Sequence, residues 1–194
     1  MAAWLDAYMK LRGQRYYVAL LSAAAFHGAT QQASQVMQLI TEFALRPIEV
    51  GRVRIESHVK HHGWGTPLSE LAGLAAPLAV STPEATALDL IAFNNRIGGI
   101  RRAAEVIAEM RSAFTVHGLR KALVAEQQTA LKQRFGYVLE VLGMERMAAE
   151  VRRVLPERCA VTALQTHAPT QLPRSAAAHP WWILDNVQLK EQWH

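Results

Sequence analysis

The chain has 194 residues, of which 51% are hydrophobic and 19% are charged, and this balance excludes an intrinsically disordered chain. Its 21 Lys and Arg residues against 16 Asp and Glu residues give a formal net charge of +5. That modest excess permits an acidic partner, either a protein surface or nucleic acid, but does not require one.

The first predicted element is helical over residues 4–27, with an interruption at Gly13. At its start, apolar side chains recur at the helical spacings of three and four, namely at Trp4, Leu5, Tyr8 and Leu11. Residues 16–26 are almost entirely apolar, so this half of the helix is expected to lie in the core. Gly28 is expected to end the helix, because glycine accepts the left-handed backbone conformation found there.

Strands are predicted next. Residues 35–42 alternate with a period of two, and residues 45–59 form two alternating runs on either side of Gly51, which indicates a hairpin. On the second run, one face carries Val53, Ile55, Ser57 and Val59, and the opposite face carries Arg52, Arg54, Glu56, His58 and Lys60. A further short strand is predicted at residues 78–80.

Helices follow these strands. Pro83 and Glu84 suit the first turn of one helix, and helical periodicity continues over residues 100–114, 119–142 and 144–155. A break in the second of these stretches is expected near Gly136. Residues 157–194 return to extended structure, which ends in a β-prone run at residues 181–187.

This order of elements predicts an α+β fold. In it, a small mixed or antiparallel sheet packs against a buried N-terminal helix and a C-terminal helical bundle. The length suits a single domain over residues 1–194. Its expected sub-regions are a helix with strands at 1–80, a helical part at 81–156, and closing strands at 157–194.

Cys159 is the only cysteine, which excludes an intramolecular disulfide and any cysteine-based metal cluster. The charged residues Asp6, Lys10 and Arg12 interrupt the opening segment, so it lacks the apolar region of a signal peptide. The apolar run at residues 16–26 is about half of a membrane span. We therefore expect a cytoplasmic protein with no membrane partner.

The densest polar cluster lies on and beside the second strand of the predicted hairpin. It consists of Arg46, Arg52, Arg54, His58, Lys60, His61 and His62. A basic strand face can contact a phosphate backbone or an acidic protein patch, so these residues form the candidate binding surface. The alternative is the solvated face of a half-buried sheet, partly neutralised by Glu49 and Glu56.

The three histidines of this cluster can suggest a zinc site. An extended strand sends neighbouring side chains to opposite sides, no cysteine lies nearby, and no His-Glu-x-x-His helix is present, so no metal site is expected. His27, near the end of the first predicted helix, is expected to be a core or capping residue rather than a catalytic one.

Catalytic chemistry has little support in the sequence. Glu84, Asp89 and Asp185 could hold a metal for nuclease chemistry only if the fold brought them together, and helix capping and dipole complementarity already explain Glu84. Neither a phosphate-binding glycine loop nor a nucleophile elbow is present. We therefore expect neither an enzyme nor a bound cofactor, and a metal-dependent nuclease is the least favoured alternative.

Two tryptophans, Trp181 and Trp182, stand side by side in the predicted closing strand, and Trp193 follows them. A regular strand turns only one of the pair inward, so the other is a candidate contact for single-stranded nucleic acid. Trp181 is therefore included in the candidate binding surface. The alternative is that the tryptophans pack into the core.

Five segments carry a further pattern: YYVALLSAAAFHGA at residues 16–29, VMQLIT at 36–41, LRPIEVGRVRI at 45–55, TPEATALDL at 82–90 and WILDNV at 182–187. Together, and in this order, they resemble the effector domain of the AbiEi-type antitoxins. No single segment is specific, but the ordered set runs through nearly the whole chain.

The resemblance implies the antitoxin of a type IV toxin–antitoxin system, a class associated with abortive infection and phage defence. Such an antitoxin counteracts a nucleotidyltransferase-like toxin without requiring a stable complex with it. Members of the family usually begin with an operator-binding winged helix-turn-helix, and Met1 lies close to the start of the resembling region. We therefore expect the antitoxin function without operator binding. The alternative is a nucleic-acid-binding or transcription-regulatory module that uses the basic strand face.

Overall fold

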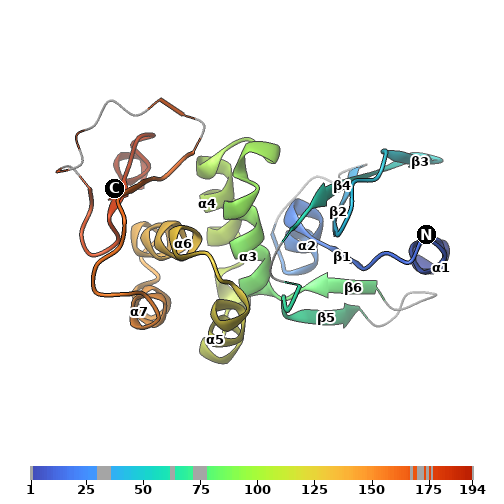
Figure 1. Cartoon of the computed structure of the whole chain (residues 1–194), viewed down its shortest axis with the longest axis horizontal. Helices are drawn as coiled ribbons and strands as arrows, with labels where there is room; N and C mark the ends of the chain where they lie inside the picture. Colours follow the sequence, from blue (N-terminus) through green and yellow to red (C-terminus); the bar gives the residue numbers. More distant parts are fainter. Residues whose placement is uncertain are drawn as a thin grey trace.

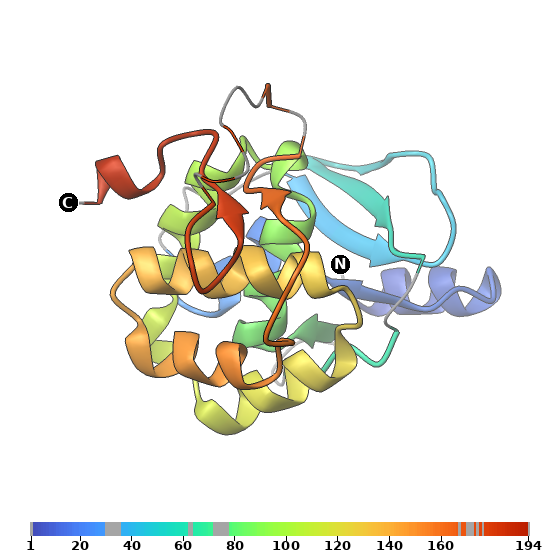
Figure 2. The ribbon, with the colours of Figure 1, turned by 60° about the vertical axis from the view of Figure 1, so that its left-hand side comes forward.

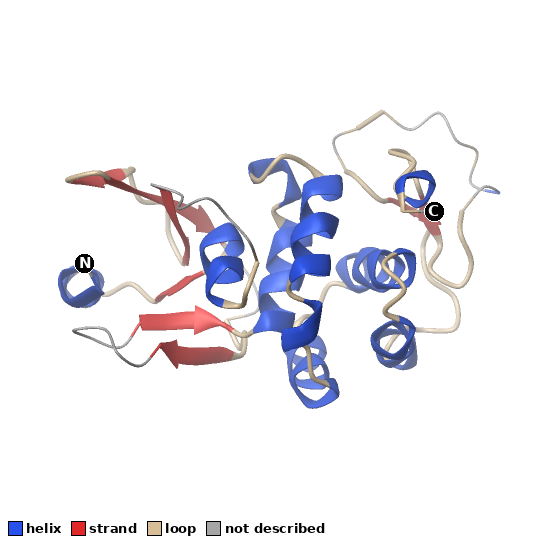
Figure 3. Cartoon of the chain, turned by 180° about the vertical axis from the view of Figure 1, so that it is seen from behind, coloured by secondary structure: helices blue, strands red, loops and turns tan. Residues whose placement is uncertain are grey.

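A computed structural model of the chain describes residues 2–29, 36–61, 64–71, 78–166, 168–169, 173, 175 and 177–193. Within these ranges it contains a six-stranded mixed sheet, a two-stranded sheet and seven α-helices, so the predicted α+β class is confirmed. The strands of the large sheet lie at one end of the molecule and most of the helices lie at the other (Figure 3).

The large sheet has the strand order β3-β4-β2-β1-β6-β5. Its strands are β1 (Tyr16–Val18), β2 (Val36–Thr41), β3 (Ile48–Val50), β4 (Val53–Val59), β5 (Leu68–Leu71) and β6 (Leu78–Ser81). The pairs β2–β4 and β1–β6 are parallel, and the others are antiparallel. The pairing between β1 and β6 is minimal, because only Val18 and Val80 are in register.

The helices are α1 (Ala2–Leu11), α2 (Leu20–Phe26), α3 (Pro83–Ala92), α4 (Ile100–Glu109), α5 (Val116–Ala125), α6 (Thr129–Val141) and α7 (Glu145–Arg153). Helix α1 lies at the far side of the sheet, whereas α2 and α3 lie between the sheet and the other helices (Figure 1). Helices α6 and α7 run side by side (Figure 2), and they lie on the side of the molecule away from the large sheet (Figure 1).

The two faces of the sheet belong to different cores, because neighbouring residues of a strand point to opposite sides. Leu39 and Val18 pack in a small core with Leu5 and Met9 of α1. The residues adjacent to these two on their strands, Tyr17 and Ile40, pack in the main core with α2, α3 and the remaining helices. The side chains of β4 alternate in the same way between the face toward α1 and the face toward the main helical layer.

The interruption predicted at Gly13 is confirmed, but the helix predicted to resume after it is wrong over residues 16–18. Helix α1 ends before Gly13, which has a φ of +63°, and residues 16–18 form β1 instead. Tyr and Val favour strands, and here they pair with β2. A continuous apolar run does not distinguish a buried strand from a buried helix, and only the pairing partner decides between them.

The predicted hairpin at residues 45–59 is confirmed as β3 and β4, with Gly51 in the turn at a φ of +61°. The helix predicted to begin at Pro83 is confirmed as α3. The break predicted near Gly136 is wrong, because Gly136 lies inside α6 and the interruption falls at residues 126–128. The closing strands are confirmed but short, as β8 (Ile183–Leu184) pairs in parallel with β7 (Thr162–Ala163).

Candidate functional site

The arginines of the predicted basic strand face are exposed at the hairpin end of the sheet. Arg46 and Arg52 form no ion pair or hydrogen bond within the described residues, and Arg54 donates from Nε to Glu56 Oε1 at 3.0 Å. An ion pair this exposed contributes little stability and stays available to other partners. These three side chains remain candidates for binding an acidic surface.

The other end of the same strand face is covered. His58 lies beside Phe93, with the ring centroids 5.8 Å apart, and its Nε2 is buried without a hydrogen-bond partner in the described structure. Burial lowers the pKa of His58, and the charge of Arg96 adds to this effect. His58 is therefore neutral at physiological pH rather than part of a basic surface.

Lys60 is also turned inward, with its side chain only 14% exposed. The expectation of one continuous solvated basic face is therefore wrong for His58 and Lys60, because this end of the face meets α3 and the residues that follow it instead of solvent. His61 is exposed, and His62 lies outside the described residues.

Lys60, which follows β4 directly, belongs to a buried polar network with residues of β1 and α3. Its Nζ donates to Asp89 Oδ1 at 2.9 Å and to Thr66 Oγ1 at 3.2 Å. The hydroxyl of Tyr17 donates to Asp89 Oδ2 at 3.0 Å. Asp89 is 1% exposed, so these donors replace the water that the carboxylate loses on folding.

The ionisation of this network follows from its burial. Burial raises the pKa of Asp89, and the charge and hydrogen bond of Lys60 partly oppose that rise. Burial also raises the pKa of Tyr17, and the charge of Asp89 raises it further. Tyr17 is therefore a neutral hydrogen-bond donor to the Asp89 carboxyl group, which also accepts from Lys60.

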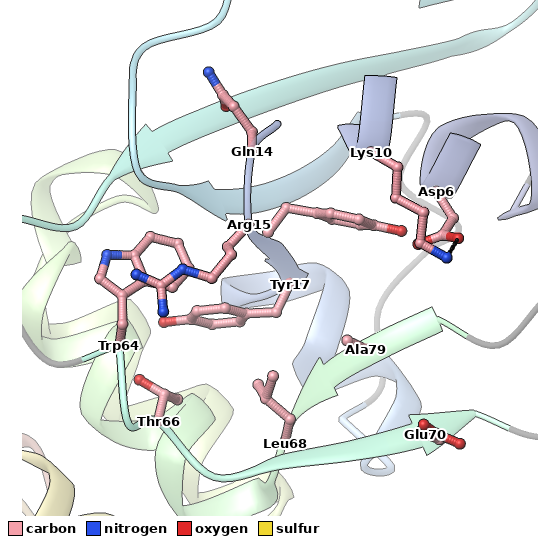
Figure 4. Close-up of a pocket in the computed structure, with 11 residues that line it drawn as sticks. Asp6, Lys10, Gln14, Arg15, Tyr17, Trp64, Thr66, Leu68, Glu70 and Ala79 are labelled. Atoms are coloured by element: carbon pink, nitrogen blue, oxygen red, sulfur yellow. Dashed lines mark ion pairs between the residues drawn. The ribbon is translucent and has the colours of Figure 1, made fainter. Parts of the chain in front are cut away.

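A pocket lies on the solvent side of Tyr17 and has a volume of about 460 Å³ (Figure 4). Its inner end is formed by Tyr17, Trp64 and Thr66, with the rings of Tyr17 and Trp64 edge to face at 5.9 Å. The guanidinium of Arg15 lies 5.1 Å from the centroid of the Trp64 ring. Arg15 is fixed there by Glu42, whose Oε1 accepts from its Nε at 2.9 Å.

The outer part of the pocket comes from three other elements. Asp6 and Lys10 of α1 form an ion pair at 2.7 Å on one side of it. Leu68 and Glu70 of β5, with Ala79 of β6, line the opposite side (Figure 4). The predicted binding residues include none of these, because the pocket arises from the pairing of distant segments that no local pattern reveals.

The three carboxylates considered for metal chemistry are separated by the fold. Glu84 Oε1 accepts hydrogen bonds from the backbone and hydroxyl of Thr115, and Asp89 is held by Lys60 and Tyr17. Asp185 accepts a hydrogen bond from Tyr137 at 2.8 Å. Among the described residues, no three His, Cys, Asp or Glu side chains are grouped so as to hold a metal ion.

His27 follows α2 directly and lies 2.6 Å through Nε2 from the carbonyl oxygen of Ser81, to which a protonated Nε2 donates. The interpretation of His27 as a core or capping residue is therefore confirmed. Its hydrogen bond ties the end of α2 to the end of β6.

The inclusion of Trp181 in the binding surface is wrong, because this residue is 1% exposed. Its ring packs against Gly136 of α6, and its Nε1 donates to Glu140 Oε2 at 2.8 Å. Trp182 is half-buried beneath the guanidinium of Arg152, which lies 5.6 Å from its ring centroid. Trp181 and Trp182 thus serve packing first, as the alternative interpretation held, whereas Trp193 is exposed.

The part of the chain that the structure describes has no helix with the length and apolarity that crossing a bilayer requires.

Comparison with protein families gives a match over residues 17–141 to the model of the AbiEi antitoxin C-terminal domain. The matched region contains β1 to α6 and with them Tyr17, Lys60 and Asp89. A comparison with curated proteins gives no match.

Among solved structures, the chain is similar to the crystal structure of the RV2827C protein from Mycobacterium tuberculosis, with a TM-score of 0.61 and 15% sequence identity. The similarity covers 92% of this chain and 65% of that one, so this chain spans under two thirds of the length of that protein. At this identity the likeness concerns the fold alone.

Proposed function

The chain belongs to the AbiEi antitoxin C-terminal domain family, and on this basis we propose that it is the antitoxin of a type IV toxin–antitoxin system. It counteracts a nucleotidyltransferase-like toxin and does so without a stable complex between the two proteins. The observation that carries the proposal is the family match over residues 17–141, which includes the large sheet and most of the helical layer.

The proposed action is non-enzymatic. Support comes from three residues that the sequence offers as candidates for catalysis, namely Glu84, Asp89 and His27. Each of them has a structural partner. Asp89 is neutralised by Lys60, Glu84 is bound to Thr115, and His27 is tied to Ser81. These contacts account for the three side chains through structural roles.

The test is co-expression of this chain with a candidate nucleotidyltransferase-like toxin. Cells that express the toxin alone are expected to stop growing, and co-expression of the full chain is expected to restore growth. An inactive toxin variant controls for the burden of expression. If growth stays inhibited while the chain accumulates in folded form, the antitoxin assignment is wrong.

A second candidate function, nucleic-acid binding, is favoured by the exposed arginines Arg46, Arg52 and Arg54. We expect the double variant Arg52→Glu/Arg54→Glu to bind RNA or DNA more weakly and to lower the slope of log affinity against log salt by about 2. The fold should not change, because both side chains are exposed. Electrophoretic mobility shifts at several salt concentrations measure the effect.

The matched control is Arg111→Glu/Arg158→Glu, which makes the same change in net charge at two exposed arginines far from the hairpin in sequence. Equal losses in both variants would indicate non-specific attraction to a basic protein. If Arg52→Glu/Arg54→Glu leaves both nucleic-acid binding and toxin neutralisation unchanged, the hairpin surface has neither role.

A further inference from the structure

Glu70 is the one charged side chain of the pocket at Tyr17 that has no opposite charge among the described residues. Lys10 pairs with Asp6 at 2.7 Å, and Arg15 pairs with Glu42 through its Nε and a second guanidinium nitrogen. Glu70 is exposed on β5 and forms no ion pair or hydrogen bond in the described structure. The pocket, taken with Glu42 behind Arg15, therefore carries one unmatched negative charge.

The wall beside Glu70 is apolar. Leu68, two residues earlier on the same strand, lines the pocket and is 46% exposed, and Ala79 of β6 lies next to it. Exposed leucine surface inside a concave site is stabilised when an apolar group covers it. A ligand that satisfies both features has an apolar stem and a positively charged head.

The aromatic end of the pocket already holds a cation of the chain itself, the guanidinium of Arg15. Indole and phenol rings attract ammonium and guanidinium groups through the negative charge on their faces. Trp64 already holds the guanidinium of Arg15 at 5.1 Å. Tyr16 adds a further aromatic wall, and its pKa is raised to about 12, first by burial and then by the charge of Asp6.

The position of the pocket in the sheet explains why the site is open. Strands β1 and β6 are in register only at Val18 and Val80, so they are not paired where Tyr16 and Tyr17 face β5 and β6. The cavity occupies this interruption, and Asp6 and Lys10 of α1 border it (Figure 4). Its volume of about 460 Å³ lies within the range of sites that bind small ligands or single side chains.

We propose that this pocket binds an organic cation, an ammonium or guanidinium group on an apolar stem, with the head at Glu70 and the stem on Leu68. The cation comes either from a free alkyl diamine or from a Lys or Arg side chain of a partner protein. An anion is disfavoured, because Arg15 and Lys10 are already neutralised while Glu70 is not. The proposal is independent of toxin neutralisation and is tested on the purified full chain.

The experiment is a nuclear magnetic resonance titration that follows the indole N–H of Trp64 and the backbone N–H of Glu70. The cationic probes are N-acetyl-lysine amide, N-acetyl-arginine amide and a four-carbon diamine. Two matched probes without a positive charge are N-acetyl-norleucine amide and N-acetyl-glutamate amide. The cationic probes are expected to shift both resonances in a saturable and salt-sensitive way, and the uncharged and acidic probes are not.

Glu70→Gln keeps the size of the side chain and removes its charge. We expect it to weaken binding of the cationic probes by at least about threefold, the order that a partly exposed charge pair contributes. Glu109→Gln, at an exposed carboxylate of α4 outside the pocket, is expected to leave binding unchanged. Leu68→Asn is expected to weaken binding through the stem.

The results also distinguish the two sources. Binding of the diamine as tight as that of the acetylated amino acids favours a free amine, whereas binding of the acetylated amino acids alone favours a partner's side chain. The proposal is overturned if no probe shifts the two resonances, if the acidic or uncharged probes shift them equally, or if Glu70→Gln binds as the natural chain does.

Discussion

Replacing Gly136 with alanine is expected to lower the free energy of unfolding by about 3 kcal/mol, the upper part of the range for overpacked cores. A Cβ at this position of α6 would overlap the six-membered ring of Trp181. The ring cannot move aside cheaply, because Trp181 is 1% exposed and its Nε1 is bonded to Glu140 at 2.8 Å. Urea unfolding followed by far-ultraviolet circular dichroism measures the loss.

A second glycine provides the control for this substitution. Gly65→Ala adds the same methyl group where its nearest neighbour is Ala125 Cβ at 3.9 Å, an ordinary contact, so little change in stability is expected. The double variant Gly136→Ala/Trp181→Leu tests the cause. If the ring is responsible, Gly136→Ala lowers the free energy of unfolding much less in the Trp181→Leu background than in the natural chain. Equal costs in both backgrounds would contradict the packing explanation.

This glycine also illustrates what local patterns miss. Gly136 predicts a helix break, since glycine is a poor helix former, yet α6 continues through it. The reason is a tertiary contact with Trp181, which lies 45 residues later in the chain. A helix can tolerate glycine where any larger residue would exclude a neighbouring ring, and only the packed structure reveals that neighbour.

The elements that could be predicted are those with local signals. The hairpin of β3 and β4 follows from alternation around Gly51, and α3 follows from Pro83 at its start. Strand β1 could not be predicted, because its three residues lie within a long apolar run and become a strand only by pairing with β2. Local sequence thus determines turns and helix starts, while pairing determines buried strands.

The same distinction applies to the candidate site. Alternation correctly places Arg54 and His58 on one face of β4, but it does not reveal that α3 covers part of that face. The pocket at Tyr17 combines α1, β1, β5 and β6 with the segment that carries Trp64, so no single stretch of sequence indicates it. Lys60 looks like a surface charge in sequence, and only the position of Asp89 makes it a buried partner.

Replacing Lys60 with methionine is expected to cost about 3–5 kcal/mol of unfolding free energy at neutral pH, because it leaves the buried carboxylate of Asp89 without a counter-charge. Methionine keeps most of the apolar stem, so the loss reports the charge rather than the packing. An exposed pair is the control. Arg54→Met removes a partner of Glu56 that is 50% exposed, and it should change stability by less than about 1 kcal/mol.

The double variant Lys60→Met/Asp89→Asn separates the charge from the other contacts of the network. Asparagine at residue 89 keeps an oxygen that can accept the hydrogen bond from Tyr17, while no buried charge remains. We expect the double variant to recover more than half of the stability that Lys60→Met loses, since replacing both partners of a buried ion pair is far less costly than removing one. A double variant as unstable as Lys60→Met would contradict this account.

The loss in Lys60→Met is also expected to depend on pH. Without Lys60, the pKa of Asp89 rises further above its unfolded value of about 3.9, because burial acts unopposed by the ammonium group. A group whose folded pKa is raised favours the folded state below its unfolded pKa, and this contribution is lost as the pH rises through the folded pKa. The free energy of unfolding of Lys60→Met should be only slightly lower than that of Lys60→Met/Asp89→Asn near pH 4. The difference between the two variants should grow toward pH 8. A difference that stays constant over this range would mean that the lost packing of Lys60, and not the unpaired charge of Asp89, destabilises the variant.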